Sequence, residues 1–256
     1  MTLQACADLV QRGDPDRFAA AMAAPVAARK VLFPLYAFNV EVARAPWVTE
    51  EPMIAEMRLQ WWRDALEEIA GGTAPRRHEV VTPLAEVIDP ATAQALDRAV
   101  AARRWDIYKE PFEDDTHFAD HIDATSGTLT WAAARSLGAP DETEAVVRDI
   151  AWGAGLAAWF QAIPELEARG RRPLPDGRAG AVQTLARQGL SRITRARRSR
   201  HGLPPSATPA LLAGWRAQGI LRRAAADPGR VAAGTLDGSE FAKRAGLLWC
   251  ATTGRW

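Results

Sequence analysis

The chain has 256 residues, 48% of them hydrophobic and 25% charged, a composition typical of a globular protein that can bury a sizeable core. Its only cysteines, Cys6 and Cys250, exclude a cysteine-based zinc framework and a disulfide-rich scaffold. No run of about 18 uncharged apolar residues is present, and the first residues lack the apolar core of a signal peptide. We therefore expect a cytoplasmic protein with one domain, residues 1–256.

The net charge of +1 is unevenly distributed. Residues 1–168 carry 15 basic and 27 acidic side chains, whereas residues 169–256 carry 17 basic and 4 acidic ones. This asymmetry indicates either an anionic partner, such as a membrane surface, or two halves that neutralise each other within one fold. No nucleic-acid-binding motif accompanies the basic residues, so nucleic acid is the least favoured partner. The candidate basic surface comprises Arg169, Arg171, Arg172, Arg195, Arg197 and Arg198.

Segments rich in Ala, Leu, Glu and Arg, separated by Pro and Gly, predict an all-α fold. Asp14 and Pro15 are typical of an N-cap and the first position of a helix. Pro25 starts another helix, which runs through Tyr36 to about Arg44. Further helices are predicted at 80–88, 90–108, 115–137, 141–163, 178–200, 206–224 and 238–252.

The helix that begins at Pro52 and ends at Gly71 has the clearest apolar periodicity. We expect its core-facing residues to be those that share one side of the helix: Ile54, Met57, Trp61, Ala65, Leu66 and Ile69. An exposed loop rich in Arg, Pro and Gly is predicted at 169–177.

Residues 114–121 contain the best candidates for metal ligands. His117 and His121 are four positions apart, so on a helix they share a face and can bind one metal ion. Asp114, Asp115 and Asp120 can hold Mg²⁺ if they face one another. The alternative is a polar helix start in which the acidic residues cap the helix and favour its dipole.

Three stretches in fixed order carry a resemblance to a known family. They are LYAFNVEVARAPW (35–47) with EMRLQWWRDALEEI (56–69), HIDATSGTLTWAAARSLGAP (121–140), and GAGLAAWFQAIPELEARGRRPLP (153–175). Together they resemble the squalene/phytoene synthase superfamily. The resemblance implies a single-domain helical bundle of the isoprenoid synthase type.

Active members of that superfamily carry two Asp-rich motifs, whose carboxylates hold the Mg²⁺ ions that bind prenyl diphosphates. The corresponding positions here are non-acidic, so the resemblance implies that both metal sites are lost and that no cofactor is bound. If Glu165 or Glu167 lies opposite Arg44, we expect an ion pair in place of the metal. The six former motif positions are Ala43, Arg44, Trp47, Ala158, Gln161 and Ala162.

The phrases AFNVEVA (37–43) and MRLQWW (57–62) are similar to the branch of the superfamily that contains a mitochondrial respiratory complex I assembly factor. This similarity implies a non-catalytic role in building an NADH dehydrogenase. A complex I subunit would then be the partner, and contact with the inner face of a membrane would be peripheral.

Two alternatives remain open. The first is an active prenyltransferase that condenses two prenyl diphosphates, with Mg²⁺ held by a non-standard set of acids: Glu41, Asp123, Glu165 and Glu167. The second is a retained cavity that binds an isoprenoid or a quinone tail, although ordinary core packing explains the same side chains. The candidate lining residues are Tyr36, Phe38, Asn39, Trp61, Ser126, Gly127, Trp159 and Phe160.

Overall fold

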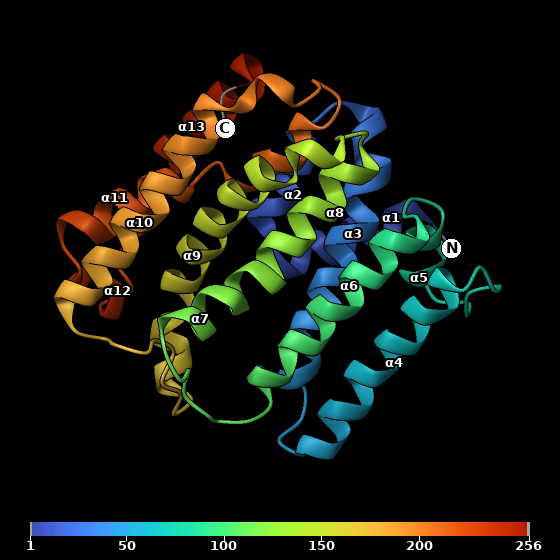
Figure 1. Cartoon of the computed structure of the whole chain (residues 1–256), viewed down its shortest axis with the longest axis horizontal. Coiled ribbons are helices and arrows are strands. Elements are labelled where there is room, and N and C mark those ends of the chain that lie inside the picture. Colours follow the sequence, from blue (N-terminus) through green and yellow to red (C-terminus); the bar gives the residue numbers. More distant parts are fainter. Residues whose placement is uncertain (1, 255–256) are drawn as a thin grey trace.

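The computed structural model describes residues 2–254 as a bundle of helices joined by loops, and no β-strand occurs among them (Figure 1). The all-α prediction is therefore confirmed. In the first half of the chain the helices are α1 (Leu3–Gly13), α2 (Pro15–Ala23), α3 (Val26–Arg44), α4 (Pro52–Ala70), α5 (Val81–Ala85), α6 (Pro90–Ala102) and α7 (Asp115–Ile122).

The second half contains the two longest helices, α9 and α10, together with shorter ones. In chain order its helices are α8 (Thr128–Ser136), α9 (Glu144–Ala168), α10 (Ala179–Arg198), α11 (Ala217–Ala226), α12 (Gly229–Ala232) and α13 (Glu240–Thr253). Short 3-10 turns extend several of them: η1 (Ala45–Trp47), η2 (Arg103–Asp106), η4 (Asp141–Thr143), η5 (Arg200–Gly202) and η6 (Thr208–Gly214). The predicted helix 206–224 is wrong in detail, because the chain forms η6 there before α11 begins.

Side-chain caps explain where several helices begin. Asp14 accepts a hydrogen bond from the backbone N–H of Arg17, and Pro15 occupies the first position of α2, as the sequence predicted. Asp114 likewise accepts from the backbone N–H of His117, which confirms the capping interpretation of this acid. Each cap satisfies a backbone donor that the first turn of a helix leaves unpaired.

The predicted helix 115–137 is continuous but contains a π-helical segment, η3 (Asp123–Gly127), between α7 and α8. Here α9 approaches very closely. A Cβ atom added at Gly155 would lie 2.6 Å from the Cβ of Ser126 and 2.9 Å from Ile122 Cγ2. Small residues on both sides of this contact are therefore needed for helix packing.

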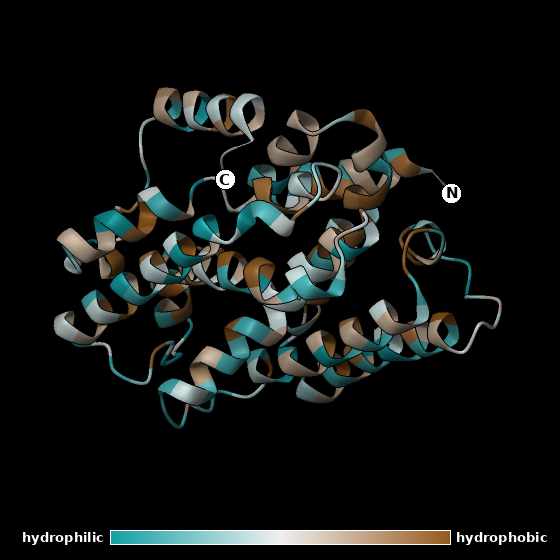
Figure 2. Ribbon diagram, turned by 45° about the horizontal axis from the view of Figure 1, so that its top comes forward, coloured by the Kyte–Doolittle hydropathy of each residue, from teal (hydrophilic) through white to brown (hydrophobic). Residues whose placement is uncertain are grey.

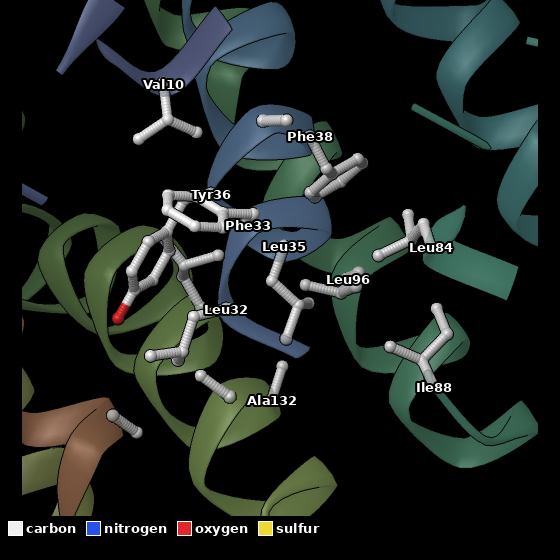
Figure 3. Close-up of a cluster of buried hydrophobic side chains, with 14 of the residues drawn as sticks. Val10, Leu32, Phe33, Leu35, Tyr36, Phe38, Leu84, Ile88, Leu96 and Ala132 are labelled. Carbon is white, nitrogen blue, oxygen red and sulfur yellow. The ribbon is translucent and has the colours of Figure 1, made fainter. Parts of the chain in front are cut away.

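Two clusters of buried side chains form the core. The larger one surrounds α3, and labelled side chains of α1, α6 and α8 lie around that helix (Figure 3). Phe38 of α3 packs edge-on against Trp62 of α4, with ring centres 5.4 Å apart. The other lies among α7, α9, α10 and α11 and includes the fully buried Trp152 and Phe160. Burial of such side chains removes large apolar areas from water, and this removal stabilises the fold.

The predicted core face of α4 is confirmed in its second half, where Ala65, Leu66 and Ile69 are buried, and wrong in its first half. Ile54 is 44% exposed and Met57 is 65% exposed, whereas the residues that face the bundle include Leu59 and Trp62. The helix carries apolar residues on two sides, and it lies at the edge of the bundle (Figure 1). Periodicity shows which residues share a side of a helix, but only the packing decides which side is buried.

Ion pairs connect the acidic and basic parts of the chain. Arg195 on α10 donates two hydrogen bonds to Asp149 on α9, at 2.6 and 2.7 Å, and Arg216 pairs with Asp16 on α2. Part of the charge asymmetry is therefore neutralised within the fold. Within residues 2–254 we find no helix with the length and apolar character needed to cross a bilayer.

Candidate functional site

The two regions that the resemblance aligned with the Asp-rich motifs, called here the former motif regions, meet at one cavity of about 600 Å³. Its wall is formed by the end of α3, the turn η1, the helix start at Asp14, the η2 turn and the middle of α9. Five of the six former motif positions line this central cavity: Ala43, Arg44, Trp47, Ala158 and Ala162. The sixth, Gln161, lines a smaller adjoining hollow of about 100 Å³ and donates a hydrogen bond to Asp237 at 2.6 Å.

Local structure explains why these positions converge. On α9, Ala158, Ala162 and Glu165 have i, i+4 and i+7 spacing, so they form one stripe along the cavity. At the other wall, α3 ends at Arg44 and the chain tightens into η1, which directs Trp47 into the cavity.

Each carboxylate on the cavity wall lies beside an arginine. The distances between guanidinium nitrogen and carboxylate oxygen are 2.6 Å for Arg17 and Asp14, 3.4 Å for Arg103 and Asp106, and 2.5 Å for Arg169 and Glu165. With Arg44 added, the cavity has four guanidinium groups against three carboxylates.

The predicted ion pair between Arg44 and Glu165 or Glu167 is wrong. Glu165 pairs with Arg169, one turn further along the chain, because residues four apart are adjacent on a helix surface. Arg44 is exposed and makes no hydrogen bond or ion pair with any residue from 2 to 254. Its charge at the C-terminus of α3 interacts favourably with the helix dipole.

Trp47 joins the two former motif regions through arginine side chains. The guanidinium carbons of Arg169 and Arg171 lie 4.7 and 5.3 Å from the centre of its ring, within the range of cation–π attraction. Arg171 also lies 5.1 Å from the ring of Trp105. A tryptophan therefore holds the loop after α9 where the resemblance placed an acidic residue.

Arg171 does not belong to the predicted basic surface, because it is only 6% exposed. Its guanidinium donates hydrogen bonds to the carbonyl oxygens of Trp105, Asp106 and Tyr108. Burial lowers the pKa of Arg171, and the nearby Asp106 opposes that shift. Burial raises the pKa of Asp106, although Arg103 and Arg171 counteract it.

The predicted basic surface is also divided in space. Arg169 and Arg172 precede α10, whereas Arg197 and Arg198 lie in its last turn. Arg172 lines a hollow with Ala179, the first residue of α10, whereas Arg169 lies against Trp47. A helix of 20 residues is about 30 Å long, so Arg172 lies far from Arg197 and Arg198. Arg195 is held by Asp149.

Three of the eight predicted cavity residues line the central cavity: Asn39, Ser126 and Trp159. Tyr36, Phe38 and Phe160 are instead packed in the core, each at most 2% exposed. Trp61 lies on α4 against Trp62 and His78, under the guanidinium of Arg76. Gly127 packs against Asp123 and Arg148. The sequence suggested that these five residues line a cavity, but each of them lies on a side of its helix that faces away from it.

His121 and His117 occupy different environments. His121 is buried among the rings of Trp105, Phe112 and Trp159, with ring-centre distances of 5.2 to 5.5 Å. Desolvation in this apolar setting lowers the pKa of His121 to about 3, with smaller effects of the Arg103 and His117 charges. His117 is exposed, and its Nδ1 accepts a hydrogen bond from the backbone N–H of Glu113.

The acids considered for a non-standard metal site are dispersed. Asp123 pairs with Arg148 at 2.9 Å, Glu165 pairs with Arg169, and Glu167 lines a separate surface hollow. Within residues 2–254, no three His, Cys, Asp or Glu side chains come together in a way suited to a metal ion. The side chains on the cavity wall therefore do not fit a Mg²⁺–diphosphate centre of the usual carboxylate type.

The sequence did not predict several of the residues that line the cavity. Asp14, Arg17, Arg103 and Asp106 come from the α1–α2 junction and from η2, outside all three resembling stretches. Their only sequence signal is the Asp14 cap, which indicates a helix start and not a cavity.

The fold and this cavity define an isoprenoid-synthase-like protein. The family model for squalene/phytoene synthase matches residues 10–178, and the chain belongs to this family. A crystal structure of a dehydrosqualene synthase in complex with ligand superposes with a TM-score of 0.79 at 13% identity, covering 98% of this chain and 95% of that one. The squalene synthase HpnC from Alicyclobacillus acidocaldarius gives a TM-score of 0.69 at 17% identity, covering 87% and 92%. At these identities the likeness concerns the fold.

Among curated proteins, the chain is similar to the human protein named NADH dehydrogenase (ubiquinone) complex I, assembly factor 6. The two are 23% identical over 173 residues, which covers 66% of this chain and 52% of the human protein. The chain thus matches about half the length of the curated relatives.

Proposed function

We propose that this chain is a non-catalytic assembly factor that helps to build respiratory complex I, with a complex I subunit as its protein partner. The observation that carries the proposal is the wall of the central cavity. Ala43, Ala158 and Ala162 face the cavity from its two sides, and each of its carboxylates lies beside an arginine. The names of the similar curated proteins support the same role.

The physical reason concerns the departure of diphosphate. Its ionisation requires Mg²⁺ held by carboxylates that are free to coordinate it. Alanine offers no ligand atom, and a carboxylate such as Glu165 at 2.5 Å from a guanidinium has part of its lone-pair capacity in use. The proposal therefore includes no metal cofactor and no turnover of prenyl diphosphates.

Retention of an open cavity supports a second part of the proposal. A volume of about 600 Å³ lies within the range of small-molecule sites. Trp47 and Trp159 supply apolar surface and four arginines supply positive charge. These features suit an isoprenoid or a quinone tail bound without chemistry, in a protein that contacts the inner face of a membrane peripherally.

A strain that lacks the gene tests the assembly role. We expect its membranes to lose NADH:quinone oxidoreductase activity and to accumulate incomplete complex I, and we expect the wild-type gene to restore both. Succinate oxidation in the same membranes is the control for general damage. Normal complex I content and activity in the deletion strain would refute the assembly role.

The open cavity also favours a second candidate, an active prenyltransferase. Purified protein would be incubated with Mg²⁺ and farnesyl or geranylgeranyl diphosphate, and released pyrophosphate would be measured. We expect no release above that of a heat-inactivated sample. Release that increases with enzyme concentration and disappears with EDTA would establish the prenyltransferase and overturn the non-catalytic proposal.

A further inference from the structure

The last helix described, α13, presents an apolar stripe to solvent. Phe241, Leu248 and Trp249 have i, i+7 and i+8 spacing, and they are 82%, 65% and 58% exposed. None of the residues of α13 is buried, and the helix lies at the rim of the bundle (Figure 2). A stripe with this spacing normally packs on a core. Here most of its area faces solvent, and only Trp249 reaches a hollow beside Trp215.

Arginines gather beside this stripe. A hollow of about 290 Å³ between α10, α11 and α13 is lined by Arg197, Arg200 and Trp249. Burial lowers the pKa of Arg197, and the charges of Arg222 and Arg200 act in the same direction. Arg200 and Arg222 are exposed, and neither forms an ion pair within residues 2–254. Arg197 and Arg200 therefore place positive charge at one edge of α13, and the charge of Arg222 lies close enough to act on Arg197.

The acidic residues next to α13 do not offset this charge. Asp237 and Glu240 both accept hydrogen bonds from the ammonium group of Lys243, at 2.9 and 2.8 Å, and Asp237 also pairs with Arg216. Arg244 lies on the exposed side of α13 between Phe241 and Leu248. The surface therefore combines an apolar stripe with positive charge in the same region.

We propose that this α13 face, formed by Phe241, Leu248 and Trp249 with Arg197, Arg200 and Arg222, docks on an anionic lipid bilayer. The indole, phenyl and leucine side chains enter the boundary between headgroups and acyl chains, and the exposed guanidinium groups of Arg200 and Arg222 bind lipid phosphates. Arg197, half-buried and bonded to Gln218, adds positive charge beneath them. A bilayer offers an apolar phase and a layer of phosphates in one plane, which matches the two kinds of side chain. Docking here deepens the proposed function and rests on it, because it assigns a surface to the peripheral membrane contact.

Co-sedimentation with vesicles tests the proposal on the full chain. The probes are vesicles of phosphatidylcholine alone and of phosphatidylcholine mixed with phosphatidylglycerol. We expect binding to the anionic vesicles that weakens as salt is added, and little binding to the neutral ones. The double substitution R200Q/R222Q should weaken binding by about thirty-fold, since each arginine near an anionic surface strengthens binding by a factor of about five.

The double substitution F241S/W249S should weaken binding by at least about tenfold, because the apolar contribution is lost. The matched control is M53S/M57S, which alters two side chains on α4 that are 75% and 65% exposed, and it should bind as wild type does. Circular dichroism would confirm that all variants are folded, which is expected since none of these side chains is buried.

Equal binding of wild type and F241S/W249S would overturn the proposal, and so would equal binding to neutral and anionic vesicles. The deletion strain separates this result from the assembly role. Normal complex I in that strain, with vesicle binding that depends on α13, would refute the assembly role and leave the docking surface standing. Loss of complex I in that strain, with no vesicle binding, would refute the docking surface alone.

Discussion

Replacing Arg171 by methionine should destabilise the protein strongly, although arginine at this position looks like a surface residue in the sequence. Methionine retains much of the apolar stem but removes the guanidinium group, which donates hydrogen bonds to the carbonyl oxygens of Trp105, Asp106 and Tyr108. The loss leaves buried acceptors unpaired, and it removes a cation that favours the charged form of the buried Asp106.

The magnitude follows from the burial of this arginine. A hydrogen bond to a charged group contributes about 1.5–3 kcal/mol, and three such bonds that share one guanidinium do not add fully, so we expect a loss of about 3–5 kcal/mol in the free energy of unfolding. The Trp47 and Trp105 rings also lose their cation–π contacts, each worth roughly 0.5–2 kcal/mol, although these contributions overlap with the network and do not simply add.

Urea denaturation followed by circular dichroism would measure the effect. With a slope of about 3 kcal/mol per molar urea, the midpoint of R171M should fall by roughly 1–1.7 M. The matched control is R172M, which removes the same group from the exposed neighbouring residue and should change stability by less than about 0.5 kcal/mol. A change below about 1 kcal/mol for R171M, or an equal loss for R172M, would refute the reasoning.

Two further predictions concern pH and packing. Because the pKa of His121 is lowered from 6.5 to about 3, the folded state binds fewer protons than the unfolded state between these two pH values. The free energy of unfolding therefore falls as the pH falls from 6.5 toward 3, by up to about 1.4 kcal/mol per pH unit. Urea denaturation between pH 7 and pH 4 should show a shallower loss for H121F than for wild type, whereas H117N, altered at an exposed site, should follow wild type; parallel slopes for all three proteins would contradict the assignment. G153V should lower the free energy of unfolding by about 1–3 kcal/mol, since even a Cβ atom there would lie 2.7 Å from Ile193. The control G180A has open space around it and should be neutral or stabilising by up to about 1 kcal/mol. Thermal unfolding would measure both variants, and a G153V protein as stable as wild type would show that α9 and α10 can separate freely.

The convergence of the two former motif regions was accessible from the sequence only through the resemblance. Nothing in the spacing of Ala43 and Ala158 indicates that they face one cavity, since more than a hundred residues separate them. The resemblance also could not specify ion pairs. It suggested that Arg44 pairs with Glu165 or Glu167, but Glu165 binds Arg169, which lies one turn further along α9.

The sequence by itself determined the all-α class, the capped starts of α2 and α7, the glycine end of α4 and the family. These features depend on local backbone chemistry or on motif order, which a sequence records directly.

Only the tertiary structure decided which residues are exposed to solvent. It buried Arg171 and left Arg172 exposed, it turned Ile54 and Met57 of α4 outward, and it left Phe241, Leu248 and Trp249 of α13 largely exposed. The physical reason is that helical periodicity fixes which side chains share a side, whereas burial depends on distant segments that pack against that side.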